Sequence, residues 1–201
     1  MRQASLVRLV FSSRPPATAM TPRNPKPPSG VFLIGFMGCG KTTVGELLSR
    51  RLGWRFQDLD VRIQARAGST IPQIFSNHGE ARFRQIEREA LLELMKEMVS
   101  VPTVVALGGG TFVQPDNRML LHGSAWPTIF LDADVQDLWE RCRSVAGERP
   151  LARDENQFRQ LHERRRSFYM EASIKVDTRG KDAASIASEI ASRLNDAIKE
   201  K

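Results

Sequence analysis

The sequence contains few residues that could cross-link the chain or bind a transition metal. Its 201 residues include two cysteines, Cys39 and Cys142, and three histidines. Two cysteines cannot form a disulfide framework, and the histidines are scattered without the spacing of zinc ligands. No apolar run is long enough to span a bilayer. These absences exclude a disulfide-rich domain, a zinc module and a membrane-spanning protein, and they favour the reducing environment of the cytoplasm.

Acidic residues are absent from residues 1–30, which contribute five of the seven net positive charges. The rest of the chain therefore has a net charge of about +2, which is ordinary. Six prolines in the same segment rule out a helix. We expect residues 1–29 to be a disordered Pro/Arg-rich extension. An unprocessed arm, or a start at Met20, is favoured over an organelle transit peptide leading to a stroma or matrix.

The remaining composition is that of an ordinary globular protein, with 41% hydrophobic and 26% charged residues in the whole chain. We expect residues 30–201 to form a single α/β domain. Apolar runs of strand length alternate with segments of helical periodicity. The five expected strands cover residues 31–34, 54–57, 103–107, 128–131 and 173–176. The expected helices include short ones at 69–75 and 115–121 and longer ones at 80–99, 134–143, 158–170 and 186–198. This alternation predicts a parallel sheet with helices on both faces.

Residues 35–42, with the sequence GFMGCGKT, match the phosphate-binding pattern G-x-x-x-x-G-K-[ST]. A predicted strand precedes them and a helical pattern follows, which is the context that this loop requires. Lys41 can reach the β- and γ-phosphates of a nucleotide, and the Thr42 hydroxyl can ligate Mg²⁺. The sequence therefore predicts that the protein binds a nucleoside triphosphate. The predicted nucleotide contacts are Gly38, Cys39, Gly40, Lys41, Thr42 and Thr43.

Two aspartates, Asp58 and Asp60, follow the second predicted strand. The carboxyl ends of parallel strands face the ligand crevice of an open sheet, so acids there are well placed for chemistry. If the chain is still extended at this point, both side chains point to one face. The alternative is helix N-capping, because aspartate is favoured at that position and a helical pattern begins at Val61. Both roles can hold together.

Three successive glycines, residues 108–110, follow the apolar strand at 103–107. Glycine is costly in backbone entropy, so three in a row indicate a close approach or a backbone with positive φ. A ligand that meets bare backbone at the end of the strand is the functional interpretation. A merely tight turn is the alternative.

Arginines occur in two helical patterns and in one loop. Arg84 alternates with glutamates in the pattern at 80–99, which is typical of a solvated face of i,i+4 pairs, and spacing alone assigns it no further role. Arg165 belongs to the run 164–166, which is typical of a solvated face or of a basic patch. Residues 144–156, with Arg149, are polar and interrupted by glycine and proline, which predicts a functional loop or lid.

Together these motifs resemble the shikimate kinase family, from about Val31 to near the C-terminus. In chain order they are Gly35-x4-Gly40-Lys41-Thr42, Asp58-Leu59-Asp60, Gly79-Glu80-x-x-Phe83-Arg84-x-x-Glu87, Gly108-Gly109-Gly110, Arg149-Pro150-Leu151 and Arg165. Several separated motifs in this order are more specific than the phosphate loop alone. The resemblance implies a P-loop NTPase fold of the nucleoside-monophosphate-kinase type, with three layers, a five-stranded parallel sheet and a lid.

The resemblance also implies a reaction, which is transfer of the γ-phosphate of ATP to the 3-hydroxyl of shikimate in the chorismate pathway of aromatic amino acid biosynthesis. The implied partners are ATP and shikimate, with Mg²⁺ as the metal. A monomer without nucleic-acid or membrane partners is expected.

Residue roles follow from the same resemblance. Asp60, Lys41 and Arg149 would be catalytic, with Asp60 accepting the proton of the attacking hydroxyl and Arg149 of the lid covering the ATP phosphates. Thr42 and Asp58 would hold the metal. The substrate residues would be Asp60, Arg84, Gly108, Gly109, Gly110 and Arg165, and the two arginines would clamp the carboxylate.

Three other functions are compatible with parts of the sequence. A kinase of the same fold could act on another hydroxylated acid such as gluconate, although the triple glycine and the Phe83-Arg84 pair argue against it. A catalytically silent relative would have lost Asp60, Arg84 or Lys41, and all three are present. A nucleic-acid-binding protein is least favoured, because no aromatic platform accompanies the basic residues.

Overall fold

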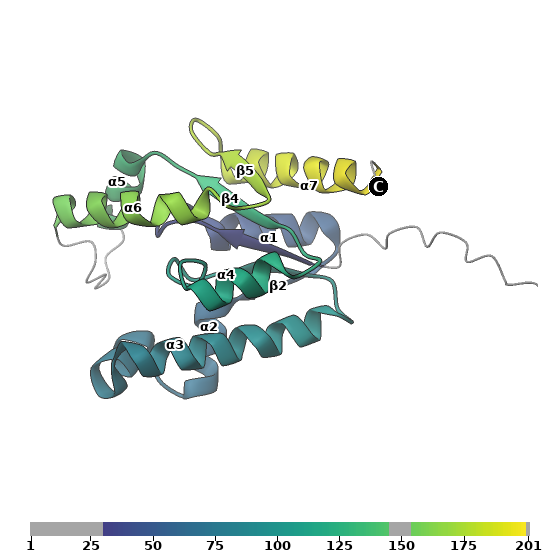
Figure 1. The fold of residues 1–201 in the computed structure, drawn as a ribbon. Helices are drawn as coiled ribbons and strands as arrows, with labels where there is room; N and C mark the ends of the chain where they lie inside the picture. Colours follow the sequence, from purple (N-terminus) through teal and green to yellow (C-terminus); the bar gives the residue numbers. More distant parts are fainter. Residues whose placement is uncertain (1–29, 145–153, 200–201) are drawn as a thin grey trace, which may run out of the picture.

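The computed structural model describes residues 30–144 and 154–199 of the chain, and the side chains as far as residue 196 (Figure 1). The predicted extension at 1–29, most of the predicted lid and its Arg149 lie outside the described residues. None of the helices in the described ranges is both long enough and apolar enough to cross a bilayer.

The centre of the structure is a five-stranded sheet in which all four pairings are parallel. The strands are β1 (Gly30–Ile34), β2 (Arg55–Asp58), β3 (Thr103–Ala106), β4 (Thr128–Asp132) and β5 (Ile174–Asp177). Their order across the sheet is β2-β3-β1-β4-β5. The predicted parallel sheet is confirmed.

Seven helices connect and cover these strands within the described residues (Figure 1). They are α1 (Lys41–Leu52), α2 (Leu59–Ala67), α3 (Ile71–Met98), α4 (Pro115–His122), α5 (Val135–Ser144), α6 (Glu155–Tyr169) and α7 (Ala183–Lys199).

Helices cover both faces of the sheet, as the alternation predicts. Leu33 of β1 lies against α1, and α1 packs on α7. Phe130 of β4 packs instead on Tyr169 of α6, with their ring centroids 5.3 Å apart. Leu33 is paired in register with Ile129, the residue before Phe130. Because successive strand residues point to opposite faces, α1 and α6 lie on opposite sides of the sheet.

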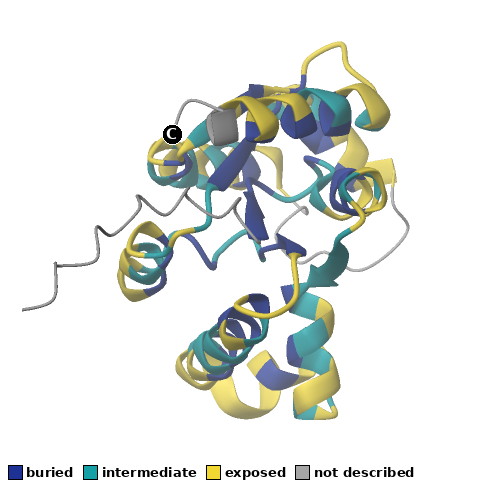
Figure 2. Cartoon of the chain, turned by 90° about the vertical axis from the view of Figure 1, so that its right-hand side faces the viewer, coloured by how far each residue is buried: buried dark blue, intermediate teal, exposed yellow. Residues whose placement is uncertain are grey.

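The core is formed by the middle of the sheet and the inner sides of its helices (Figure 2). Every residue of the central strand β1 is buried, whereas Lys175 in the edge strand β5 is exposed. Continuous apolar runs are typical of parallel strands that are covered on both faces. The carboxyl ends of the buried strands β1 and β3 are therefore well-supported positions for functional side chains, and β2 is paired with β3 at the edge.

Most expected boundaries differ from the structure by one to three residues, and three differences affect the site or the loop beside it. The helices expected at 69–75 and 80–99 form the single element α3, interrupted at Gly79, which has φ 74° and ψ 175°. The chain is not extended through Asp60, because α2 begins at Leu59 with Asp58 as its N-cap. Glu155 and Asn156, which were expected in the loop 144–156, belong to α6. Asp154 caps that helix by accepting a hydrogen bond from the backbone N–H of Gln157, 2.9 Å away.

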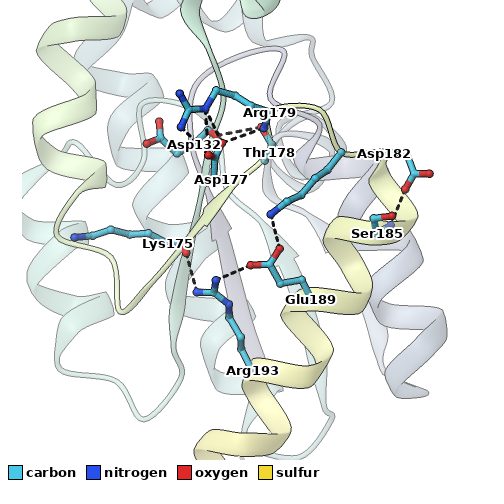
Figure 3. A network of polar contacts seen from close by, with 10 residues as sticks. Asp132, Lys175, Asp177, Thr178, Arg179, Asp182, Ser185, Glu189 and Arg193 are labelled. Carbon is cyan, nitrogen blue, oxygen red and sulfur yellow. Dashed lines mark hydrogen bonds and ion pairs between the residues drawn. The ribbon is translucent and has the colours of Figure 1, made fainter.

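The turn that follows β5 is attached to α7 by a network of polar contacts (Figure 3). Arg179 pairs with Asp177 at 2.7 Å, and Glu189 accepts from both Lys181 and Arg193, at 2.7 and 2.6 Å. No site residue predicted from the sequence belongs to this network. Its role in the described structure is to fix the turn against the last helix.

Helix α1 lies directly on the sheet because Gly45 has no side chain. A Cβ atom at Gly45 would lie 2.4 Å from Cε2 of Phe56 in β2 and 3.3 Å from Cδ1 of Leu33 in β1. This close approach brings the first turn of α1, with Thr42, next to the end of β2, with Asp58.

Gly45→Ala is therefore expected to lower the free energy of unfolding by about 1–3 kcal/mol, the usual cost of overpacking a core. Urea denaturation followed by circular dichroism measures this change. Glu46→Ala, at the next and exposed position of α1, is the matched control. Equal stability of the two variants would contradict the packing argument.

Candidate active site

The loop between β1 and α1 ends in a helix N-terminus without a side-chain cap. Gly40 is the N-cap, and its left-handed backbone, with φ 89° and ψ 18°, is one that glycine adopts without strain. The first turn of α1 contains no acidic residue. Its N–H groups and the positive end of the helix dipole therefore face the loop, which makes this end of α1 suited to bind phosphate.

The side chain of Lys41 lies across the same loop. Its Nζ donates hydrogen bonds to the carbonyl oxygens of Gly35, at 2.9 Å, and Phe36, at 3.0 Å. The ammonium is thus held beside the backbone that would surround a phosphate. Cys39 is buried under the loop, as expected of a residue that fills a small position there.

Gly38 and Thr43, two further predicted nucleotide contacts, lie in the turn of the loop and in the first turn of α1, respectively. Gly38 is packed against α5, since a Cβ atom there would lie 2.9 Å from Sγ of Cys142. Thr43 is exposed in the first turn of α1. The backbone of the loop is therefore supported from α5, while its helical end is open to solvent.

Asp58 connects the phosphate loop to the second strand and is the N-cap of α2, as the capping interpretation predicts. Its Oδ2 accepts a hydrogen bond from the Thr42 hydroxyl at 2.9 Å. Its Oδ1 accepts the N–H of Asp60 at 3.0 Å and that of Val61 at 3.4 Å, which caps α2. Oδ1 of Asp58 thus caps α2, and Oδ2 contacts Thr42 at the end of the phosphate loop.

The Thr42 and Asp58 pair has the chemistry of a magnesium site. Both side chains offer oxygen, which is the ligand that Mg²⁺ prefers, and Mg²⁺ commonly keeps one or two protein ligands and completes its shell with phosphates and water. Within the described residues, no group of three or more His, Cys, Asp or Glu side chains could hold a metal. These residues therefore fit a metal that arrives with a nucleotide, and not one enclosed by the protein.

Asp60 lies in the first turn of α2, beside the glycine segment 108–110. Burial and, after it, the negative charge of Asp58 raise the pKa of the Asp60 carboxyl to about 6, although the Lys41 ammonium opposes this shift. A carboxylate with a pKa near the working pH is an effective acceptor for a proton. The site thus contains a carboxyl group with a raised pKa next to a phosphate loop.

Arg84 of α3 points into the same region and is held by two glutamates of its own helix. Its Nη1 donates to Oε2 of Glu87 at 2.9 Å, and its Nε and Nη2 donate to Oε1 of Glu80 at 3.2 and 3.1 Å. The guanidinium also lies over the Phe83 ring, 5.0 Å from its centroid. The interpretation of a solvated i,i+4 face describes the exposed Glu80 but not the buried Glu87.

Glu87 is a functional neighbour that the sequence analysis gave no role. Its side chain is 1% exposed and accepts a hydrogen bond from the Thr111 hydroxyl, 2.7 Å away. It thereby joins Arg84 to the segment just after the glycines. One signal was available in the sequence, because Glu87 lies four residues after Phe83 and three before Ala90, within the apolar stripe of the helix.

The three glycines are each approached by a different side chain of the site. A Cβ atom at Gly108 would lie 2.6 Å from Oδ1 of Asp60, and one at Gly110 would lie 2.9 Å from both Nη atoms of Arg84. At Gly109 it would lie 3.5 Å from Nη1 of Arg165. None of the three glycines has a positive φ. Close approach, and not an unusual backbone conformation, therefore explains Gly108 and Gly110, whereas a Cβ atom at Gly109 would make only an ordinary contact.

The run of three arginines in α6 divides among three surroundings. Arg164 is exposed, and Arg166 forms an ion pair with Asp132 at the end of β4, 2.5 Å away. Arg165 lies over Phe36 of the phosphate loop, 5.9 Å from its ring centroid. Arg165 is therefore the one of the three that faces the glycine segment.

Gly110→Ala tests whether the glycine makes room for Arg84. The new methyl group would displace the flexible end of the arginine, so we expect a folded protein with a displaced guanidinium. If Arg84 binds an acidic acceptor, the KM for that acceptor should rise by about tenfold or more, as for a weakened charged hydrogen bond. Steady-state kinetics with each substrate varied in turn measure this, and an unchanged acceptor KM would contradict the argument. The KM for nucleotide should not change.

The described site therefore consists of two adjoining parts. The loop and α1 carry Gly38, Cys39, Gly40, Lys41, Thr42 and Thr43, and Asp58 joins them. The other part brings together Asp60, Arg84, Arg165 and the three glycines. A phosphate loop beside a carboxyl group with a raised pKa and two arginines is the arrangement expected of a P-loop phosphotransferase for a small, negatively charged acceptor.

Comparisons with known proteins identify the family. The shikimate kinase family model matches residues 37–195. The shikimate kinase of Geobacter sulfurreducens is 43% identical over 164 residues, which cover 80% of this chain and 88% of that protein. A shikimate kinase of Thermus thermophilus is 40% identical over 174 residues, or 85% of this chain and 92% of that protein. The chain belongs to the shikimate kinase family.

Solved structures support the same conclusion. The shikimate kinase of Acinetobacter baumannii in complex with shikimate has a TM-score of 0.76 and 33% identity, covering 84% of this chain and 93% of that chain. A gluconokinase of Sinorhizobium meliloti has a TM-score of 0.57 and 18% identity, covering 87% of this chain and 96% of that chain, which supports the fold alone.

Proposed function

We propose that this protein transfers the γ-phosphate of ATP to the 3-hydroxyl of shikimate, giving shikimate 3-phosphate and ADP. The observation that carries the proposal is the convergence of Asp60, Arg84 and Arg165 on the glycines 108–110, beside the phosphate loop. Shikimate carries one carboxylate and several hydroxyls on a ring. The site offers the guanidinium groups of Arg84 and Arg165 for the carboxylate of shikimate, and the carboxylate of Asp60 for a hydroxyl.

Two arginines suit the carboxylate of the acceptor. A guanidinium is planar and donates in pairs, so it matches the geometry of a carboxylate better than an ammonium does. Arg84 is oriented by Glu80 and Glu87 beside Gly110, and Arg165 of α6 lies next to Gly109. The bare backbone between them would allow the ring to approach closely.

Asp60 is the group that would accept the proton of the attacking hydroxyl. Its raised pKa supports this role, because a stronger base takes a proton more readily. Its position beside Gly108 would orient the same hydroxyl toward the phosphate loop. Phosphoryl transfer needs little covalent assistance, so orientation and neutralisation of charge are the main contributions of the protein.

Three groups would neutralise the phosphates. The Lys41 ammonium lies over the loop, and Arg149 would approach from the segment between α5 and α6. Thr42 and Asp58 would hold Mg²⁺, directly or through water. Mg²⁺, when bound, would reduce the negative charge on the phosphate oxygens during transfer. We further propose that the enzyme acts in the cytoplasm as a monomer. The low cysteine content of the chain supports the reducing compartment.

A direct test measures ADP release by the purified chain with MgATP and one of three additions, which are shikimate, gluconate or buffer. Turnover with shikimate alone is expected, and mass spectrometry should identify shikimate 3-phosphate. Turnover with gluconate alone would assign the chain to another acceptor of the same fold class. Equal, slow release in all three samples would show hydrolysis without transfer, and the roles given to Arg84 and Arg165 would then be wrong.

A further inference from the structure

Tyr169 is the only tyrosine in the sequence, and it lies at the end of α6 with 1% of its surface exposed. Its ring packs against Phe130 of the sheet. Its hydroxyl donates a hydrogen bond to the backbone carbonyl of Gly109. A buried phenol therefore joins the last turn of α6 to the middle glycine of the site.

The backbone at Gly109 is enclosed on two further sides. A Cβ atom there would lie 3.7 Å from the carbonyl oxygen of Gly35 and 3.8 Å from the nitrogen of Met37, both in the phosphate loop. On another side it would lie 3.5 Å from Nη1 of Arg165. A small displacement of Gly109 would therefore change its position relative to both the phosphate loop and the arginine.

Arg165 and Tyr169 are four residues apart, so they are neighbours on one face of α6. Burial raises the pKa of the Tyr169 hydroxyl, while the positive charge of Arg165 opposes this shift. The phenol thus keeps its proton and donates it to the carbonyl of Gly109. The Arg165 guanidinium and the Gly109 carbonyl therefore both lie near this one hydroxyl.

We propose that Tyr169 is a positioning residue that holds Arg165 and the Gly109 backbone in one fixed arrangement on the acceptor side of the site. The proposal rests on the proposed function, in which both groups face shikimate. An alternative is that Tyr169 only fills the core beside Phe130. The positioning role requires the hydroxyl of Tyr169, whereas packing against Phe130 requires only the ring.

Tyr169→Phe separates these roles, because it keeps the ring and removes only the hydroxyl. We expect the KM for shikimate to rise about three- to tenfold, as for the loss of one hydrogen bond, with kcat and the KM for ATP unchanged. An unchanged KM for shikimate, or an equal rise in both KM values, would overturn the proposal.

A matched control measures the effect of a buried hydroxyl elsewhere in the same sheet. Thr128 is 1% exposed at the amino end of β4, away from the carboxyl ends of the strands, and its hydroxyl accepts the N–H of Ser173 at 3.1 Å. Thr128→Val should lower the melting temperature without a change in either KM. If it raised the KM for shikimate as much as Tyr169→Phe, a general loss of stability would explain both, and the proposal would fail.

A double variant tests whether Tyr169 acts together with Arg165. Adding Tyr169→Phe to Arg165→Ala should raise the KM for shikimate less than adding it to the wild type, because the shared arrangement is already lost. If Tyr169→Phe raised the KM for shikimate by the same factor in both backgrounds, the two residues would act independently, and the proposed coupling would be overturned.

Hydrogen exchange provides a readout that does not depend on the substrate. Amides of residues 108–113 should exchange faster in Tyr169→Phe than in the wild type, with the Thr128→Val protein unchanged there. This experiment remains informative if the wild type does not phosphorylate shikimate, so failure of the proposed function and failure of this proposal can be told apart. Equal exchange in Tyr169→Phe and the wild type would overturn the role of the phenol.

Discussion

Asp60→Asn is expected to reduce the kcat for shikimate phosphorylation by about 10²- to 10⁴-fold, the usual contribution of a positioned base. Asparagine keeps the shape of the side chain and its place beside Gly108, but it cannot accept the proton of the hydroxyl. The affinity for nucleotide should remain close to that of the wild type, because Lys41 and the loop are unchanged. Single-turnover kinetics and titration with ADP measure the two effects separately.

The control for Asp60→Asn is Asp116→Asn, because Asp116 is a highly exposed carboxylate at the start of α4. It should have normal kinetics. Unchanged turnover in Asp60→Asn would remove the base from the proposed mechanism. A large loss of nucleotide affinity would instead mean that Asp60 acts through the phosphate loop.

Asp60→Asn is also expected to stabilise the fold at neutral pH. The pKa of Asp60 is raised from 3.8 to about 6 by folding, so its ionised form opposes folding. The contribution of this carboxyl to stability is complete below about pH 4 and is lost as the pH rises through about 6. Asp60→Asn, which stays neutral, should therefore raise the free energy of unfolding at pH 7 by up to about 3 kcal/mol.

Urea denaturation without metal or nucleotide tests this, with wild type and variant compared at each pH. The difference should be largest at pH 7 and should disappear below about pH 3, since the wild-type carboxyl is then protonated in both states. A variant that is less stable at pH 7 would show that the charge of Asp60 is well compensated in the fold. Loss of activity with a gain of stability is the combination that a functional, partly buried carboxyl predicts.

Arg84→Ala has the second-largest expected effect on activity. Removing a charged donor to the substrate carboxylate should raise the KM for shikimate by about 10- to 100-fold, while the KM for ATP stays constant. Arg84→Lys should recover only part of this loss, because an ammonium lacks the planar pair of donors. An effect limited to ATP would refute the proposed contact with the carboxylate.

Arg84→Ala also leaves Glu87 buried without its charged partner, which should cost about 3–5 kcal/mol of stability. The double variant Arg84→Ala/Glu87→Gln removes that buried charge, so it should recover much of the stability but none of the affinity for shikimate. Arg88→Ala, on the same helix and paired with the exposed Asp116 at 3.7 Å, is the control. If the double variant regained the affinity, misfolding and not the lost contact would explain the single variant.

Local patterns in the sequence determined the architecture and one half of the site, and the family resemblance alone selected Arg84 and Arg165 for the other half. Alternation of apolar strands with helical patterns is a local property, so it identified the parallel sheet without knowledge of the strand order. The phosphate loop is also local, because a continuous run of residues forms it between a strand and a helix. The positions of Asp58 and Asp60 followed from the rule that ligands bind at the carboxyl ends of parallel strands.

The remaining features depended on the tertiary structure. Arg84 could not be distinguished from Arg82 or Arg88 by spacing, since each follows the same pattern of alternating charges along the helix. Only the packing of α3 beside the glycines turned Arg84 toward the site and buried Glu87 beneath it. Arg165 is a second example. It belongs to a run of three arginines, and only the structure shows that their surroundings differ.

The role of the triple glycine was also decided in three dimensions. The sequence predicted either a close approach or a positive φ, and the structure shows close approaches at Gly108 and Gly110, each by a side chain from a different helix. Tyr169 lies 60 residues from Gly109 in the chain and yet donates to its carbonyl. Local patterns cannot predict such contacts, because the orientation of one helix relative to a loop is set by the packing of the whole core.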